Sequence, residues 1–321
     1  MKKNISKIAK IVLPLSLGVF LIWYSYHNTS PEDRQQIYTS IKNADYLWVF
    51  LSLLLGLLSH LSRAYRWHFL LKPLGYEPRF LNSLMAVSIA YFANLGIPRS
   101  GEILRATTLT TYEGVPFQKA FGTIVAERIV DLLMLLLIIF AALIMQTDTI
   151  INFFMERGFD FKFLLLLALL GLLGLFIFFR FIKISENILA VKLKAFINGL
   201  IEGALSIFKM KNKAPFILHT FFIWAMYLLM FWVIKYSVAG TESLSLDGIF
   251  TAFIAGTFAI SATNGGIGVY PIAVSKILVL YGISATAGDA FGWIMWSAQT
   301  LLVVIIGVLS FLFLPIFNAK K

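Results

Sequence analysis

The sequence contains no cysteine, and only 13% of its 321 residues are charged. The absence of cysteine excludes disulfide bonds and thiol catalysis. The four histidines are isolated from one another and no His-x-x-Glu-His pattern occurs, so a catalytic metal site is not expected. The nucleotide-binding pattern Gly-x-x-x-x-Gly-Lys-Ser/Thr is also missing, which argues against a pump driven by nucleotide hydrolysis.

The chain is instead rich in apolar residues, which make up 59% of it and raise the mean hydropathy to +0.84. A soluble domain could not keep such a surface hydrated. Residues 163–179 include no charged side chain and, with their edges, reach the roughly 20 residues that cross about 30 Å of hydrocarbon. Further apolar segments lie at 11–26, 47–62, 81–97, 122–146, 216–238, 248–262, 269–282 and 290–317.

Helices are expected throughout, because lipid offers backbone groups no hydrogen-bond partner. The sequence predicts an all-α fold: a polytopic integral membrane helical bundle of about eight membrane segments, two of them broken or re-entrant. Segment 11–26 could be a signal peptide, but Tyr24-Ser25-Tyr26-His27 lacks the small-residue cleavage pattern, so we predict an uncleaved first span. Apart from the paired broken segments no internal repeat is visible, and residues 1–321 are predicted to form a single membrane domain.

The distribution of Lys and Arg among the loops predicts the orientation. Both termini and the stretch 180–213 are basic, so we place them in the cytoplasm, with the protein in the cell (inner or plasma) membrane. The loops expected outside are 27–46, 147–161 and 239–247. An amphipathic segment at about 185–213 is predicted to lie in the cytoplasmic interface, as a passive connector or a lipid sensor. The net charge of +11 suits anionic lipid rather than nucleic acid, because no basic soluble domain is present.

The first broken element is predicted at 81–97, which ends at Pro98. A full span there would place Arg99, Arg105 and Lys119 outside, against the positive-inside pattern. A half-helix that enters and returns avoids this conflict. Irregular backbone is allowed at membrane depth where protein or a water-filled cavity surrounds it.

The second broken element lies between the short apolar segments 248–262 and 269–282. It contains Asn264, Gly265, Gly266, Gly268 and Tyr270. A plain tight turn is one interpretation, although a turn alone would not need three glycines in four residues. Paired interrupted segments, one in each half of a chain, are typical of a transporter binding site. We therefore expect two broken elements that face each other.

Charged residues cluster beside these elements. Arg99, Glu102 and Arg105 recur every three residues and predict a stripe of alternating charge, either a structural salt-bridge row or a site where arginine forks bind a phosphate. Glu127, Arg128 and Asp131 open the fourth predicted span and provide counter-charges or further ligands. Charge at membrane depth is costly, which favours a functional role.

Arg63 and Arg66 lie next to Trp67 and His68 at the end of segment 47–62. One interpretation is an interfacial anchor, with basic side chains snorkelling and an indole at headgroup level. The other is direct contact with a ligand. The sequence is compatible with both interpretations.

Together these motifs resemble the lysylphosphatidylglycerol synthase transmembrane family, whose members are also called flippase-like domain proteins. The resemblance covers about 45–312 and rests on four motifs in order: Arg63-x-x-Arg66-Trp67, Asn94-Leu95-x-Ile97-Pro98-Arg99-x-Gly101-Glu102-x-x-Arg105, Glu127-Arg128-x-x-Asp131 and Gly265-Gly266-x-Gly268. It implies a polytopic bundle with re-entrant elements and movement of aminoacylated phosphatidylglycerol between leaflets.

Two departures from the family pattern limit that implication. Relatives that synthesise lysylphosphatidylglycerol have a cytosolic aminoacyl-transferase domain, whereas this sequence ends at Lys321, so we expect it not to make that lipid. In many relatives Pro precedes the glycine run and Glu follows it; here Asn264 precedes it and Tyr270-Pro271 follow. The altered glycine motif therefore does not support lysylphosphatidylglycerol as the cargo.

Three function classes follow. The favoured one is a lipid flippase that moves an anionic phospholipid or a lipid-linked precursor; the others are an integral-membrane transferase acting on a lipid, and a non-transporting partner of an envelope-lipid enzyme. Expected partners are membrane lipids, with a homo-oligomer or a separate lipid-modifying enzyme as further options; no cofactor is implied. The candidate lipid-binding residues are Arg63, Arg66, Asn94, Arg99, Glu102, Arg105, Glu127, Arg128, Asp131, Asn264, Gly265, Gly266, Gly268 and Tyr270.

Overall fold

A computed structural model describes residues 23, 27, 30–97, 99–146, 210 and 213–319, all of which are helical or in turns and loops. The chain divides into two compact units, Met1–Glu127 with Lys211–Lys321, and Arg128–Met210. The predicted segments 11–26 and 163–179 fall outside the described residues, apart from Trp23, and so does almost all of the amphipathic segment 185–213.

The helices of the described residues are α2 (Pro31–Lys42), α3 (Tyr46–Leu71), η1 (Lys72–Leu74), α4 (Phe80–Gly96), α5 (Ser100–Glu113), α6 (Phe117–Met145), α10 (Lys213–Ile234), α11 (Leu246–Ala262), α12 (Val269–Leu280) and α13 (Ala285–Asn318).

Four helices of the described chain are long and apolar enough to cross a membrane: Tyr46–Leu74, Phe117–Met145, Lys213–Ile234 and Ala285–Asn318. The shortest has 22 residues and extends about 33 Å at 1.5 Å per residue. Three shorter apolar helices, α4, α11 and α12, accompany them. The chain is therefore a multi-pass helical membrane protein, as its hydropathy predicts.

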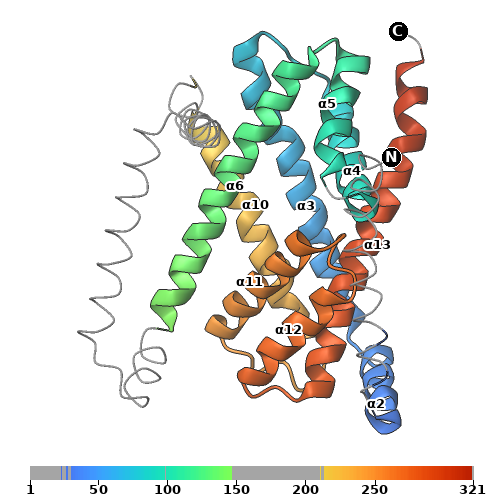
Figure 1. Ribbon diagram of the computed structural model, residues 1–321, viewed down its shortest axis with the longest axis vertical. Coiled ribbons are helices and arrows are strands. Elements are labelled where there is room, and N and C mark those ends of the chain that lie inside the picture. The colour runs from blue at the N-terminus through green and yellow to red at the C-terminus, as the bar shows by residue number, and fades with distance from the viewer. Residues whose placement is uncertain are drawn as a thin grey trace, which may run out of the picture. The chain divides into compact units, whose positions relative to one another are not determined.

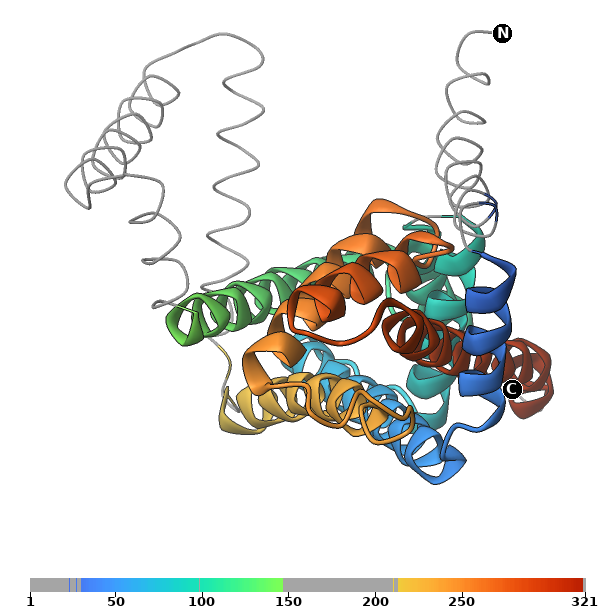
Figure 2. The ribbon, with the colours of Figure 1, turned by 90° about the horizontal axis from the view of Figure 1, so that it is seen from below.

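Helices α3 and α10 pack side by side and antiparallel (Figures 1 and 2). Near one end of the pair, the Ser52 hydroxyl donates to the Met230 carbonyl at 2.9 Å; near the other, Arg66 Nη1 donates to Thr220 Oγ1 at 2.9 Å. Trp67 of α3 is fully buried. This pair forms one wall of the first unit.

Helices α4 and α5 form the first hairpin, which confirms the predicted break after 81–97. Helix α4 ends at Gly96 because Ile97 precedes a proline and adopts an extended conformation, with φ −123° and ψ 112°. The Asn94 side chain reaches across the break and accepts from the Gly101 amide at 2.8 Å, which satisfies a donor in the first turn of α5. A side chain at Gly101 would place its Cβ 2.1 Å from the Ala90 carbonyl oxygen, so glycine permits the close approach of the two helices.

Helices α11 and α12 form the second hairpin. Helix α11 ends at Ala262, and α12 begins after Gly268. Gly265, Gly266 and Gly268 all have positive φ, at 64°, 79° and 70°, which side chains rarely adopt. The turn alone thus accounts for three glycines, and the expectation that it would not need them together is wrong.

Helix α13 packs against both hairpins. A Cβ at Gly292, in its first half, would lie 2.7 Å from the Pro271 carbonyl of α12, and a Cβ at Gly307, in its second half, would lie 2.3 Å from Phe92 Cβ of α4. Asn264 Nδ2 donates to the Gly96 carbonyl at 3.2 Å. The hairpins therefore enter the unit from opposite ends, α4–α5 from the top and α11–α12 from the bottom of Figure 1, and their tips meet.

Within the first unit, this arrangement is an inverted repeat of a long helix followed by a hairpin. Helix α3 with the hairpin α4–α5 is repeated as helix α10 with the hairpin α11–α12, and α10 runs antiparallel to α3. The two tips share the sequence Asn-x-Gly-Ile, at Asn94 and at Asn264, which are 170 positions apart. Sequence reading found the paired breaks but not this repeat. Inverted repeats with broken helices are a recurrent architecture of membrane transporters.

Candidate functional site

Glu127 of α6 is the centre of a buried ion-pair cluster. Its Oε2 lies 2.5 Å from Arg105 Nη1 of α5, and its Oε1 lies 3.4 Å from Arg66 Nη2 of α3. Glu127 and Arg66 are 0% exposed, and Arg105 is 2% exposed. Glu127 is the eleventh residue of α6, about 15 Å along that helix at 1.5 Å per residue. We call these three residues the arginine cluster.

Aromatic and hydroxyl groups fix the two guanidinium groups in place. The Arg105 guanidinium lies 3.8 Å from the centre of the Trp67 ring, close enough for a cation–π interaction. The Trp67 indole in turn donates to Thr123 Oγ1 at 2.8 Å, while Arg66 is held by Thr220. Side chains of α3, α5, α6 and α10 therefore converge on one point. The interfacial-anchor interpretation of Arg66 and Trp67 is wrong, because both are buried within the protein.

Arg63 lies one turn before Arg66 on α3 and is 2% exposed. Its Nη2 donates to Tyr227 Oη at 3.2 Å, and its guanidinium carbon lies 6.0 Å from the ring centres of both Tyr91 and Tyr227. The two tyrosine hydroxyls are 3.1 Å apart. Arg63 therefore extends the buried polar region from the arginine cluster toward the middle of α3, so the anchor interpretation fails for it as well.

The charged residues at the tip of the first hairpin, where α4 turns into α5, differ in burial and in contacts. Arg99 is exposed and precedes α5 with φ 63°, while Arg105 is buried as the sixth residue of α5. Glu102 Oε2 accepts from Asn94 Nδ2 at 3.5 Å. The predicted stripe of Arg99, Glu102 and Arg105 does not form one surface, because α5 begins only at Ser100.

The residues of the second tip hold the hairpins together. Asn264 is 1% exposed and donates to the first tip, and a Cβ at Gly265 would lie 2.5 Å from Leu95 Cδ2. The Gly265 carbonyl accepts from Trp296 Nε1 at 2.8 Å. Tyr270 is 6% exposed, and its ring occupies the space that a side chain at Gly256 would take. These residues make the contact between the tips.

In the second unit Arg128 Nη1 lies 3.7 Å from Asp131 Oδ2, an i,i+3 pair of the kind that the spacing predicts. The Arg128 side chain is 44% exposed and that of Asp131 is 10% exposed. Such a pair contributes little stability when one partner is solvated.

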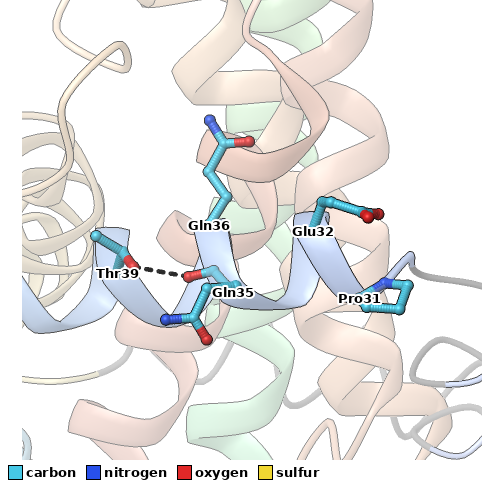
Figure 3. Close-up of a pocket in the computed structure, with 5 residues that line it drawn as sticks. All are labelled: Pro31, Glu32, Gln35, Gln36 and Thr39. Atoms are coloured by element: carbon cyan, nitrogen blue, oxygen red, sulfur yellow. Dashed lines mark hydrogen bonds between the residues drawn. The ribbon is translucent and has the colours of Figure 1, made fainter.

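A shallow hollow runs along α2 and is lined by Pro31, Glu32, Gln35, Gln36 and Thr39 (Figure 3). Thr39 Oγ1 donates to the Gln35 carbonyl at 2.8 Å, as Figure 3 shows. All five side chains come from one solvated helix, and none is buried. The hollow therefore lacks the converging buried groups of a binding site. In the described part of the chain, no group of three His, Asp or Glu residues is placed to hold a metal ion.

Sequence reading missed the neutral partners of the site. Tyr91, Tyr227, Thr220 and Thr123 hold the arginine side chains or Trp67, but a hydroxyl residue in an apolar helix has no distinctive pattern. The partners of Glu127 lie 22 and 61 positions away, beyond the reach of helix spacing.

Comparison with known proteins identifies the family. The sequence pattern of the lysylphosphatidylglycerol synthase TM region matches residues 11–307. The chain belongs to this family. A UPF0104 membrane protein of Methanocaldococcus jannaschii is 32% identical over 124 residues, which cover 38% of this chain and 34% of that protein. The chain thus aligns with about a third of that relative's length, and no solved structure matches.

The motif residues that first suggested the lysylphosphatidylglycerol synthase TM family can now be assigned to the arginine cluster and to the two hairpins. Of its motif residues, Arg66, Arg105 and Glu127 meet in the arginine cluster, while Asn94 and Gly101 shape the first hairpin. Gly265, Gly266 and Gly268 shape the second. The motifs therefore divide into one ionic group and two structural ones.

Proposed function

We propose that this protein moves an anionic phospholipid or a lipid-linked precursor between the leaflets of the cell membrane. The observation that carries the proposal is the arginine cluster, in which two guanidinium groups flank one carboxylate inside a membrane-spanning bundle. Buried charge of this kind is rare in membrane proteins and marks substrate pathways.

The chemistry is an exchange of one anion for another. Arg66 and Arg105 each contact Glu127, and arginine binds phosphate through the same forked donors that bind carboxylate. A headgroup phosphate displaces Glu127 from one guanidinium group. When the lipid is released, Glu127 pairs with that guanidinium group again. When no lipid is bound, Glu127 offsets one of the two guanidinium charges, which lowers the cost of burying them.

The inverted repeat supplies the movement. Two hairpins that enter from opposite ends and meet at Asn264 and Gly96 form a contact that opens toward either leaflet. In transporters with this architecture, one repeat rocks against the other around a central site. The glycine turn of the second hairpin tolerates the backbone changes that such opening needs.

Both termini are proposed to be cytoplasmic. The basic residues Lys72, Arg79 and Lys119 gather at one end of the first unit, where Arg79 and Asn82 also contact Asn318 at the end of α13. Positive residues favour the cytoplasmic side. This end of the unit therefore faces the cytoplasm in our proposal.

Transport accounts for the cluster better than catalysis. Both carboxylate oxygens of Glu127 contact guanidinium groups, an arrangement that suits the binding and release of an anion. A separate lipid-modifying enzyme would supply any modified cargo.

The test is a leaflet assay in phosphatidylcholine vesicles that contain a trace of fluorescent phosphatidylglycerol. The wild type should expose inner-leaflet probe to an added quencher, and Arg105→Ala should slow this by about tenfold or more, equivalent to about 1.4 kcal/mol. Arg34→Ala, a change in the outer helix α2, serves as the matched control and should behave as the wild type. Vesicles with wild-type protein that exchange probe no faster than empty vesicles would contradict the proposal.

A further inference from the structure

One face of α3 carries a continuous row of small and polar residues. They lie within an arc of about 120° of the helix, at 100° per residue, and span about 21 Å along its axis at 1.5 Å per residue. We call this row the α3 stripe; its members are Ser52, Gly56, Ser59, His60, Arg63 and Arg66, and all are buried. Its length is about two thirds of the roughly 30 Å thickness of the hydrocarbon core.

The stripe joins the arginine cluster to the opposite half of the bundle. Its C-terminal end is Arg66, which contacts Glu127. At its N-terminal end Gln299 Nε2 of α13 donates to Ser52 Oγ at 3.1 Å. The Gln299 amide also lies against Gly56, where a Cβ would be 2.6 Å from Gln299 Oε1. Polar groups from α4, α10 and α13 therefore accompany the stripe along its whole length.

His60 is the member of the stripe that stands between these two ends. Its ring contacts Tyr91 of α4 edge-on, with ring centres 4.6 Å apart, and Arg63 follows one turn later. Only 6% of His60 is exposed, yet its Nδ1 has no hydrogen-bond partner among the described residues. Buried polar atoms in folded proteins are nearly always paired, so an orphaned ring nitrogen needs an explanation.

We infer that the α3 stripe is the path of the lipid headgroup and that His60 Nδ1 binds the headgroup between the arginine cluster and Gln299. This inference rests on the proposed function and names the step that follows the arginine cluster. The ligand class is a phospholipid headgroup whose phosphate or hydroxyl groups pair with a ring nitrogen. Ser59 and Ser52 continue the same row of polar groups toward the other leaflet.

The alternative is a purely structural histidine. A structural role is satisfied by any side chain that fills the space beside Tyr91, whereas headgroup binding needs a polar atom at the place of Nδ1. Asn sets a polar atom near the position of Nδ1, Gln sets one near Nε2, and Leu sets none. The three substitutions therefore separate packing from binding.

The experiment measures probe exchange in the same phosphatidylcholine vesicles for the wild type, His60→Leu, His60→Gln, His60→Asn and Arg105→Ala. We expect exchange about tenfold slower in the Leu and Gln variants and near the wild-type rate in the Asn variant. The control His68→Leu, on the same helix outside the stripe, should exchange as the wild type. Thermal unfolding and gel filtration verify that each variant is folded; if the Leu variant fails to fold, the Asn and Gln pair decides.

The outcomes distinguish this inference from the proposed function. Exchange at the wild-type rate in His60→Leu, together with slow exchange in Arg105→Ala, overturns the inference and leaves the proposed function standing. Equal loss in the Asn and Leu variants overturns the role of Nδ1. If the wild type itself exchanges no probe, the proposed function fails first.

Discussion

The two hairpins of this protein share an architecture and differ in charge. Each breaks at an Asn-x-Gly-Ile sequence and returns as a second short helix. The first carries Arg99, Glu102 and Arg105 within twelve residues of Asn94, whereas residues 264–275 of the second carry no charge. Charged side chains thus follow the first break closely, whereas in the second hairpin the charged residues, Asp247 and Lys276, lie away from the break.

The two hairpins therefore have different structural roles. The first delivers Arg105 to Glu127, so its packing determines the geometry of the arginine cluster. The second presents glycine backbone to Leu95 and an amide to the Gly96 carbonyl, so it forms the contact of the tips. Substitutions in the first hairpin should therefore weaken the ion pairs of the arginine cluster. Substitutions in the second hairpin should weaken the contact between the two hairpin tips. If this division holds, substitutions in the arginine cluster should cost the most stability and substitutions at the contact of the tips the least.

Glu127→Gln is expected to cause the largest loss. It leaves the buried Arg66 and Arg105 facing a neutral amide, and breaking one side of a buried ion pair typically costs about 3–5 kcal/mol. The free energy of unfolding in detergent measures this loss. Glu102→Gln, at the partly exposed first tip, should cost about 1 kcal/mol or less. Equal losses in the two variants would remove the distinction between cluster and tip.

Gly101→Ala tests the packing of the first hairpin. The new Cβ would meet the Ala90 carbonyl at 2.1 Å, and backbone cannot give way as a side chain can, so we expect a loss of about 1–3 kcal/mol. Gly96→Ala is the matched control, since no atom lies within 4 Å of its Cβ position, and it should stabilise by up to about 1 kcal/mol. Thermal unfolding of both variants gives the comparison; a neutral Gly101→Ala would show that α4 and α5 are not in contact there.

Gly265→Ala tests the turn of the second hairpin. Its φ of 64° is unfavourable for a side chain by about 1–2 kcal/mol, and the new Cβ would meet Leu95 Cδ2 at 2.5 Å. The added change Leu95→Ala should relieve the contact but not the backbone strain. A double-mutant cycle on the free energy of unfolding separates the two parts, and a cycle with no coupling would mean that the tips do not touch.

Asn264→Ala should have the smallest effect. It removes the hydrogen bond to the Gly96 carbonyl, worth about 0.5–1.5 kcal/mol. The amide oxygen Oδ1 of Asn264 has no partner among the described residues, so its removal offsets part of that loss. Ser261→Ala, an exposed position next to the turn, should lie within about 0.5 kcal/mol of the wild type in the same unfolding measurement. A loss above about 3 kcal/mol at Asn264 would contradict this account.

Much of the fold is legible in the sequence because lipid imposes simple rules. Apolar length placed α6, α10 and α13 within about five residues of their observed ends, but α3 continues nine residues past the predicted segment 47–62, through Arg63 and Arg66. The count of arginines predicted that the segment ending at Pro98 must return. Helix α2 was missed: residues 27–46 were read only as an outer loop. Its signal was present, since Ser30 caps the helix and Pro31 opens it.

The site was only partly predictable, for a physical reason. Helix spacing relates residues three or four apart, and it correctly paired Arg128 with Asp131. It also suggested one stripe through Arg99 and Arg105, which the start of α5 at Ser100 prevents. The pairing of Glu127 with Arg66 depends on how separate helices pack, which local spacing does not encode.

The central claim is that the arginine cluster receives an anionic headgroup, and native mass spectrometry of the purified protein tests it most directly. The wild type should retain a bound phospholipid with an anionic headgroup, and Arg105→Ala should lose it while Arg34→Ala keeps it. Retention of the same lipid at the same occupancy in folded Arg105→Ala protein would contradict the claim.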